Sequence, residues 1–380
     1  MSDSDRPVAC VDMGSLNIRV GWAGDDSPQI TTRSLIGYPK YKPAMFASGQ
    51  KYSYIGDEAI SKRGVLSYRP VMHHGENVDW DHMEMLWTYL FENELRVGMK
   101  DLSIVSADAV LGCHSRREKT AQILFENFNV REWYCGLAPV MALYGTATPS
   151  GLSVCIGDGV TQLIPIVGGS VVLESAKRIN FGGRNITKYL NELVISRGYY
   201  FENSSTEQDI IRDVKEKFSY TTMDYWSACQ QVVQYGSKVK EYLLPDGNVL
   251  SFGKELFQCN EAWFDPTLVQ KEYPGIHQMI YNCVESMDID NKREMYENIV
   301  LSGAATLTEG FCQRLQYEVQ QLIPESVTCR VVAGNERHNN VWLGCSVLGS
   351  MTNYLYGMTM KSEEYDENGP SWVHRKFMDA

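Results

Sequence analysis

The chain has 380 residues, 44% of them hydrophobic, and a formal net charge of −12 at pH 7. This length and composition predict a globular protein of roughly two to four domains and exclude a largely disordered chain. The acidic balance argues against attachment to nucleic acid or to anionic membranes through a general positive field.

The ten cysteines form no C-x-x-C pair, so the common zinc and thioredoxin-like patterns have no support, and free thiols in a reducing compartment are predicted. The first residues, MSDSDRPVAC, are acidic and lack the apolar core of a signal peptide. No apolar run is long enough to span a bilayer as a helix. We therefore expect a cytoplasmic or nuclear protein.

The first motif in the chain is a predicted β-hairpin. Two apolar runs, Val8–Val11 and Ile18–Trp22, flank a turn that holds Gly14 and Ser15. Backbone N–H groups in such a turn, with a small hydroxyl beside them, can bind a phosphate, and Asp12 would lie in reach of a phosphate-bound cation. An ordinary hairpin gives the same pattern, so this turn alone does not establish a phosphate site.

The segment that follows is predicted to alternate loops, helices and strands. Ser34–Arg63 is rich in glycine, proline and tyrosine, which indicates either a plain surface loop or an exposed interaction loop. Asp79 is predicted to cap a helix, and Leu102–Ala107 has the composition of a strand. Ser115 is predicted to cap the next helix in a capping box with Glu118.

A second copy of the hairpin pattern strengthens the first. Ser153–Ile166 consists of an apolar strand, a turn made of Gly157, Asp158 and Gly159, and another apolar strand. The two turns are roughly 140 residues apart, which is a spacing of domains. Two facing hairpins of this kind predict a nucleotide clamped between duplicated lobes.

The rest of the chain continues as a mixed α/β pattern. A strand that runs into small residues and then a helix, at Asn298–Thr306, predicts an anion or ribose site. The further predicted elements are a strand at Ser170–Leu173, a helix through Ile186–Val194 that ends at Gly198, helices at Asp209–Phe218, Ile276–Met287 and Val341–Tyr354, a hairpin around Gly247, a helix from Glu309 and a strand at Val327–Ala333.

The sequence resembles the actin family along its whole length. The resemblance implies an α/β, two-lobed actin-like fold, with duplicated mixed-sheet domains around a nucleotide cleft and two smaller subdomains. The stretches that carry it are WAGDDSP (Trp22–Pro28), YIGDEAISKRG (Tyr54–Gly64), FENELRV (Phe91–Val97), REKTAQILFENFNV (Arg117–Val130), GDGVT (Gly157–Thr161), IIRDVKEK (Ile210–Lys217), LPDG (Leu244–Gly247) and EYDENGPSWVHRKF (Glu364–Phe377).

The same resemblance implies a division of the chain into four parts. They are a first lobe core from residues 1–33, 71–145 and 339–380, a small subdomain with a D-loop-like segment at 34–70, a second lobe core from 146–182 and 273–338, and a second small subdomain at 183–272.

It also implies the cofactor, which is ATP or ADP with Mg²⁺ or Ca²⁺, and its binding residues. Asp12 would reach the metal through water. Arg19 stands where actins have a lysine, Leu16 replaces a glycine, and Thr308 and His338 replace residues near the adenine. The implied nucleotide-binding positions are Gly14, Ser15, Leu16, Arg19, Gly157, Asp158, Gly159, Gly183, Lys215, Glu216, Gly303, Ala304, Thr308 and His338.

The main departures from the family pattern fall at positions around the water that would attack the γ-phosphate of ATP. Ala138 stands in place of the glutamine that orients this water, Cys155 in place of a second metal-shell aspartate, and Gln162 in place of a histidine. Loss of such positioning and acid–base groups typically costs ~10²–10⁴ in rate each, without being additive. We therefore predict impaired hydrolysis and no confident catalytic residue.

Two segments bear on polymerisation. The D-loop-like segment Tyr41–Gln50 gains Pro43, and the plug-like loop Thr267–Lys271 is more polar than is usual in the family. His74 matches the family's modified histidine. These features predict weak self-polymerisation.

The sequence is compatible with three functions. The leading prediction is a nucleotide-holding structural protein of the cytoskeleton, a subunit of a filament or of a larger complex with protein partners, with an axonemal (ciliary) or a chromatin complex in the nucleus included. The alternative is an active ATPase that polymerises, with hydrolysis timing its turnover. A small-molecule kinase of the same fold is the third, although a fold alone does not give a function.

Overall fold

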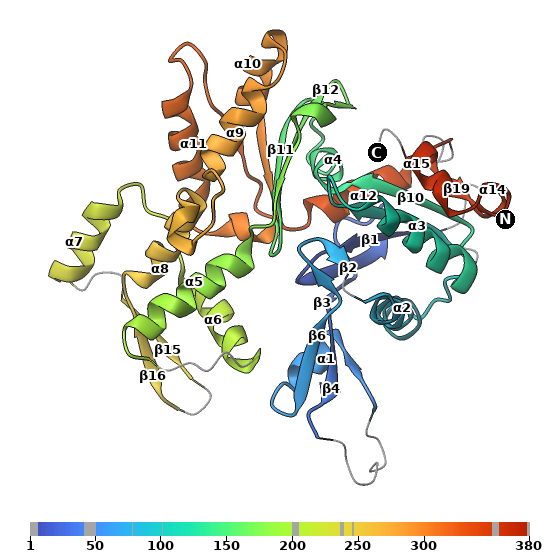
Figure 1. Ribbon diagram of the computed structural model, residues 1–380, viewed down its shortest axis with the longest axis horizontal. Helices are drawn as coiled ribbons and strands as arrows, with labels where there is room; N and C mark the ends of the chain where they lie inside the picture. The colour runs from blue at the N-terminus through green and yellow to red at the C-terminus, as the bar shows by residue number, and fades with distance from the viewer. Residues whose placement is uncertain are drawn as a thin grey trace.

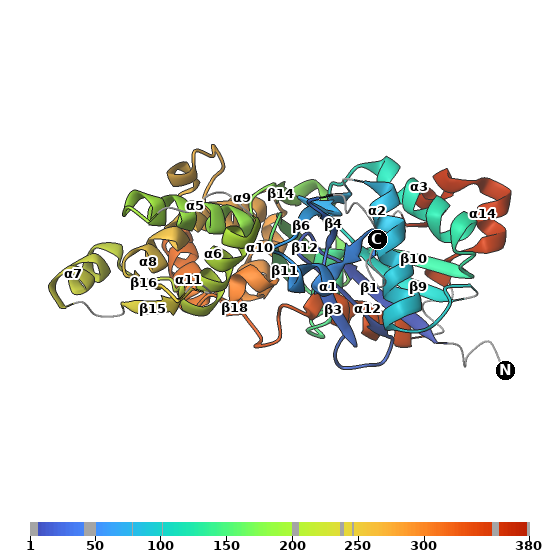
Figure 2. The same ribbon diagram turned by 90° about the horizontal axis from the view of Figure 1, so that it is seen from below.

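The structure is a computed structural model. It describes residues 7–41, 51–77, 79–100, 102–199, 205–235, 239–244, 247–351 and 357–377. The predicted D-loop-like segment, apart from Tyr41, lies outside these residues. Figure 1 shows two halves on either side of two central helices, and Figure 2 shows the same halves from below, with α7 at one end of the molecule and α14 at the other.

The first half is built on a six-stranded mixed sheet. Its first two strands form the predicted hairpin, in which Asp12 lies directly opposite Arg19. The central strand pairs with the hairpin partner on one side and with a parallel strand on the other, and its residues Val8–Val11 are buried. The strands, in sheet order, are β19 (Met360–Lys361), β10 (Glu132–Leu137), β9 (Ser103–Asp108), β1 (Val8–Met13), β2 (Asn17–Trp22) and β3 (Ile30–Arg33).

The second half repeats this plan. An antiparallel meander again supplies a central strand, and parallel strands again follow on the other side of it. The predicted duplicated, two-lobed α/β architecture is therefore confirmed. In sheet order the strands are β13 (Ser170–Val171), β12 (Thr161–Val167), β11 (Gly151–Ile156), β17 (Ile299–Ser302) and β18 (Val331–Val332), and β14 (Lys177–Ile179) also pairs with β12.

Two helices, α4 (Ala138–Tyr144) and α12 (Asn340–Ser350), lie between the sheets (Figure 1). α12 packs on β1 and α4 packs on β11. The helices cross closely because Gly344 has no side chain: a Cβ there would lie 1.8 Å from the carbonyl oxygen of Met141. This close crossing brings the ends of the two hairpins toward each other.

Further helices cover the outer faces of the two sheets. Those of the first half are α2 (Trp80–Thr88), α3 (His114–Gln122), α14 (Ser362–Asn368) and α15 (Val373–Lys376), with π-helical turns at Tyr89–Glu94 and Ile123–Asn127; those of the second are α9 (Ile276–Glu285), α10 (Ile289–Glu297) and α11 (Phe311–Leu322). α2, α9 and α11 each bury an apolar face, as the 3.6-residue period predicts.

Two smaller units extend from the halves. The loop predicted at Ser34–Arg63 contains strands and a helix instead, because its short apolar pairs build a small core of Tyr54, Ala59 and Leu66. The elements of the first unit are β4 (Leu35–Pro39), β5 (Tyr54–Ile55), α1 (Gly56–Ser61) and β6 (Leu66–Pro70), followed by β7 (Met72–His73) and β8 (Glu76–Asn77); those of the second are α5 (Gly183–Ser196), α6 (Ser205–Phe218), α7 (Tyr225–Tyr235), β15 (Lys240–Leu243), β16 (Val249–Phe252) and α8 (Glu255–Gln258).

The two predicted helix caps have different outcomes. Asp79 does cap α2, because its carboxylate accepts the N–H groups of Asp81 and His82 at 3.0 and 3.2 Å. The capping box at Ser115 is wrong: α3 begins at His114, so Ser115 lies inside the helix and Cys113 is at its N-cap. Glu118 is not available for a box, since its carboxylate contacts the His374 ring at 2.8 Å.

Several predicted boundaries are also corrected. The strand expected at Ser170–Leu173 stops at Val171 and passes into a 3-10 turn, and the strand expected at Val327–Ala333 is reduced to two residues at the sheet edge. α11 starts at Phe311 rather than Glu309, because Gly310 adopts a positive φ of 79° where the chain passes close to the Thr221 carbonyl. Among the helices in the described ranges, none is long and apolar enough to cross a membrane.

Candidate functional site

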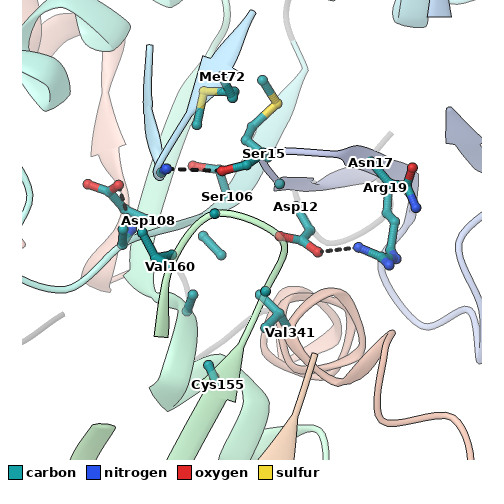
Figure 3. Close-up of a pocket in the computed structure, with 18 of the residues that line it drawn as sticks. Asp12, Ser15, Asn17, Arg19, Met72, Ser106, Asp108, Cys155, Val160 and Val341 are labelled. Carbon is teal, nitrogen blue, oxygen red and sulfur yellow. Dashed lines mark hydrogen bonds and ion pairs between the residues drawn. The ribbon is translucent and has the colours of Figure 1, made fainter. Parts of the chain in front are cut away.

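The turns of the two hairpins meet at one cavity. His74 connects them, with its Nδ1 2.6 Å from the carbonyl oxygen of Gly159, and the hydroxyl of Ser15 accepts the N–H of Gly75 at 3.0 Å. A Cβ on Gly159 would lie 2.7 Å from the Ser15 hydroxyl, so only glycine allows this approach. Figure 3 shows the cavity, with Asp12, Ser15 and Cys155 on its wall.

The second turn is supported by the start of α5. The N–H groups of Gly183 and Arg184 donate to the carbonyls of Gly157 and Asp158, both at 2.9 Å. The Arg184 guanidinium binds the Asp158 carboxylate at 2.8 Å and reaches the Ser15 carbonyl of the opposite turn at 3.4 Å. Arg184 from the second half and His74 from the first half therefore hold the two predicted phosphate loops against each other.

Not every N–H group of the two turns is free to bind a phosphate. The N–H of Gly14 donates to the Asn17 carbonyl at 3.1 Å, and the N–H of Gly157 donates to the Val160 carbonyl at 2.9 Å. These two glycines close their turns. The carbonyl of Leu16 accepts the Ser34 N–H at 2.8 Å, which ties the first turn to the start of the small unit.

Asp12 and Arg19 form an ion pair on the cavity wall (Figure 3). The Arg19 Nη1 lies 3.0 Å from the Asp12 Oδ2, and the two side chains are only 9% and 14% exposed. The Arg19 Nε also donates to the Asn339 side chain at 2.9 Å, so the guanidinium is held by two partners. Burial raises the pKa of Asp12, and the charge of Arg19 opposes that rise.

Only some of the residues predicted to bind the nucleoside line the cavity. Gly303, Ala304 and His338 line it. Lys215 instead donates to the Gly183 carbonyl at 2.9 Å, and burial lowers its pKa. Gly183, Lys215, Glu216 and Thr308 do not line this cavity as the structure has it.

A buried arginine behind this loop was not predicted. Arg337 donates from Nε to the Thr306 hydroxyl at 2.8 Å, from Nη2 to the Thr306 carbonyl at 2.7 Å and from Nη1 to the Gly334 carbonyl at 2.7 Å. It fixes the turn that carries Gly303 and Ala304. Nothing in the local sequence distinguishes it from an exposed arginine.

The three departing residues, Ala138, Cys155 and Gln162, all line the cavity. Cys155 is buried, with its Sγ 2.7 Å from the Ser302 hydroxyl. Burial raises the pKa of its thiol to about 12, so the group is neutral near pH 7 and is neither a carboxylate nor a thiolate ligand.

Gln162 forms a bond between the two halves. Its Oε1 accepts the N–H of Val110 at 2.6 Å. Arg178, next to it across β12 and β14, donates to the Val110 carbonyl at 3.0 Å and to the His74 carbonyl at 2.9 Å. The N–H and the carbonyl of Val110, which belongs to the first half, are thus both bound by side chains of the second half.

We expect Gln162→Ala to lower the free energy of unfolding by about 1–3 kcal/mol, because the buried Val110 N–H loses its acceptor. Urea denaturation of both proteins, followed by tryptophan fluorescence, measures this. Gln321→Ala, at an exposed position of α11, is the matched control and should be close to neutral. Equal effects of the two changes would show that the Gln162 bond contributes nothing.

A charged cluster behind the first turn was also missed. Asp108 pairs with both Arg116 and Arg117, the latter at 3.0 Å, and Glu76 pairs with Arg178 at 3.0 Å. Asp108 also accepts the N–H of Ala109 at 2.6 Å. These residues come from four separate segments, and only the tertiary fold brings them together.

The donor set suits a polyphosphate better than a metal ion. Glycine-lined turns with a hydroxyl and guanidinium groups match phosphate oxygens. For a divalent cation the wall offers Asp12, Asp108 and Asp158, each of which already binds an arginine, and the neutral Cys155 thiol. Within the described ranges, no group of three or more His, Cys, Asp or Glu side chains is placed to hold a metal ion.

The fold and this cavity define a class of protein: two duplicated α/β lobes that meet at paired hairpin turns. A family model described as Actin matches residues 4–378. An "Actin-like protein" of Neurospora crassa is 36% identical over 386 residues, which cover 99% of this chain and 100% of the relative. The chain belongs to the actin family. This membership indicates an actin-type nucleotide-binding protein of the cytoskeleton, and members of the family generally bind the nucleotide with a divalent cation.

Proposed function

We propose that this protein holds ATP or ADP between its lobes as a structural ligand, with impaired hydrolysis, and serves as a subunit of a filament or larger assembly. The observation that carries the proposal is the chemistry of one cavity. Both hairpin turns reach it, yet Ala138, Cys155 and Gln162 line it without an acid, a base or a free acceptor for a water molecule. A ligand that binds only the native state stabilises it by mass action.

The two turns and the other predicted residues that line the cavity keep their roles in this proposal. The turns with Ser15 and Gly159 bind the phosphates, together with Arg19, and the nucleoside lies toward Gly303 and His338. Lys215, Glu216, Gly183 and Thr308 would contact it only after a rearrangement. For a Mg²⁺ or Ca²⁺ ion that arrives on the phosphates, Asp12 is the carboxylate that we propose to reach its water shell.

The wider setting is part of the same proposal. We propose the four-part division of the chain given above, protein partners in an actin-type cytoskeletal assembly in the cytoplasm, and no direct contact with membrane or nucleic acid. An axonemal or chromatin complex, and so a place in a cilium or the nucleus, is compatible with it. The alternative, an active ATPase that polymerises, is favoured by the retained Asp12 and by both retained turns; phosphate release separates the two.

Nucleotide binding is tested by thermal unfolding of protein stripped of nucleotide, with and without Mg-ATP. At 100 times the dissociation constant we expect about 2.7 kcal/mol of stabilisation, visible as a higher midpoint. Gly159→Val should abolish the shift, because its side chain would fill the contact with Ser15 and His74. Gly64→Val, at an open surface position, is the control and should keep it. The absence of a shift in the unchanged protein, with no nucleotide recovered on purification, would refute the proposal.

Self-assembly is expected to be weak. The plug-like loop Thr267–Lys271 overlaps a 3-10 turn, Pro266–Val269, in which Leu268 is the large apolar residue at the surface. One apolar side chain contributes little burial between protomers. Sedimentation in polymerising salt measures this, and abundant homopolymer at concentrations where ordinary actin assembles would contradict it.

A further inference from the structure

We infer that this site binds its nucleoside polyphosphate without requiring a divalent cation, because arginine side chains already neutralise each carboxylate on the cavity wall. This inference rests on the proposed function, since it assumes that the cavity takes a nucleotide. It specifies the form of that ligand: the metal-free nucleotide binds about as well as its magnesium complex.

The first carboxylate is Asp12. Its partner Arg19 lies opposite it in the hairpin register, so the backbone itself places the two charges side by side. Asn339, at the start of α12, holds the other side of the guanidinium. The pair is therefore fixed by three elements and is shielded from water, which preserves its electrostatic attraction.

The other two carboxylates of the wall are paired in the same way. Asp158 binds Arg184 at 2.8 Å, and Asp108 binds Arg117 at 3.0 Å as well as Arg116. The described lining contains no further aspartate or glutamate. The lining holds three carboxylates and three guanidinium groups, namely Asp12, Asp108 and Asp158 with Arg19, Arg116 and Arg117, and Arg184 binds Asp158 from outside the lining.

This balance disfavours a divalent cation in two ways. Mg²⁺ prefers carboxylate, carbonyl and water oxygens, and an arginine partner offsets the negative charge that each carboxylate would offer it. Separation of a shielded ion pair leaves an uncompensated charge, which is strongly unfavourable. The neutral thiol of Cys155 offers no hard oxygen in compensation.

The same balance favours phosphate. A guanidinium carries five N–H donors in a fork that matches phosphate oxygens, and it is always charged. In Arg19, Asp12 and Asn339 take one N–H each. The carboxylates of the cavity wall are thus neutralised by guanidinium groups that are fixed in place, so no bound cation is needed to offset them beside the phosphates.

The test is calorimetric titration of stripped protein with ATP, once in excess Mg²⁺ and once in EDTA. We expect dissociation constants within about 3-fold of each other, which is less than 1 kcal/mol. Binding that is more than about 10-fold weaker in EDTA would overturn the inference while leaving the proposed function intact. Absence of binding in both buffers would instead refute the proposed function, and the inference with it.

Arg19→Gln tests the residue itself. Without its partner, Asp12 is free, so we expect binding in EDTA to weaken at least about 10-fold and Mg²⁺ to restore much of it. Arg19→Lys keeps a positive charge there and should keep metal-independent binding. Arg33→Gln, in the same sheet but away from the cavity wall, is the matched control. Circular dichroism checks folding, and unchanged metal-free binding in a folded Arg19→Gln protein would overturn the inference.

Discussion

Replacement of Ala138, Cys155 and Gln162 together by glutamine, aspartate and histidine is expected to raise single-turnover ATP hydrolysis at least ~10-fold. In transfer of a phosphoryl group to water, the protein mainly positions the water and stabilises charge. The three positions line one cavity with both hairpin turns. The change therefore supplies an acceptor, a carboxylate and a base where the chain has a methyl group, a neutral thiol and an amide that already binds Val110.

Single changes at these positions should help little, because residues that act as a unit are not additive. Phosphate release from pre-bound ATP is the measurement, in assembled and in unassembled protein, since assembly can activate the site. Gln162→His also removes the bond to Val110, so the folding of each variant must be checked. If the unchanged protein already hydrolyses ATP as fast as an ordinary actin, impaired hydrolysis is wrong and another residue positions the water.

The duplicated hairpins could be predicted because their signal is local. In Val8–Trp22 and in Ser153–Ile166, apolar runs are interrupted by glycine turns, and no distant contact is needed to recognise them. Even the Asp12–Arg19 pair follows from the hairpin, once the bond from the Gly14 N–H to the Asn17 carbonyl fixes the register. The pair itself was not predicted, because that bond sets the register.

The contacts between the halves could not be predicted. Gln162 and Arg178 bind Val110 from 52 and 68 residues away, and only the placement of the second sheet against the first decides this. The capping box at Ser115 failed for a related reason. Its Glu118 has a competing partner, His374, 256 residues further along the chain. Local patterns thus predict the turns, whereas tertiary contacts determine which side chains remain free for other interactions.

Asp108→Ala is expected to be the most destabilising single change considered, at about 3–5 kcal/mol in the free energy of unfolding, because it removes the carboxylate that two poorly exposed arginines share and leaves excess positive charge there. Asp108 is 8% exposed and Arg116 and Arg117 are 10% and 16% exposed, so water cannot replace the lost carboxylate fully. Urea denaturation of the stripped protein is the measurement.

Two further variants show whether charge is the cause. Asp108→Asn keeps the shape and the acceptor for the Ala109 N–H but not the charge, so its cost should be intermediate. Asp366→Ala, at an exposed position of α14, should be nearly neutral. The double variant Asp108→Ala/Arg116→Ala should cost less than the sum of its single changes, because it also removes one of the two guanidinium groups that share this carboxylate. Strict additivity, or an Asp108→Ala protein as stable as the Asp366→Ala control, would show that the cluster does not stabilise the fold.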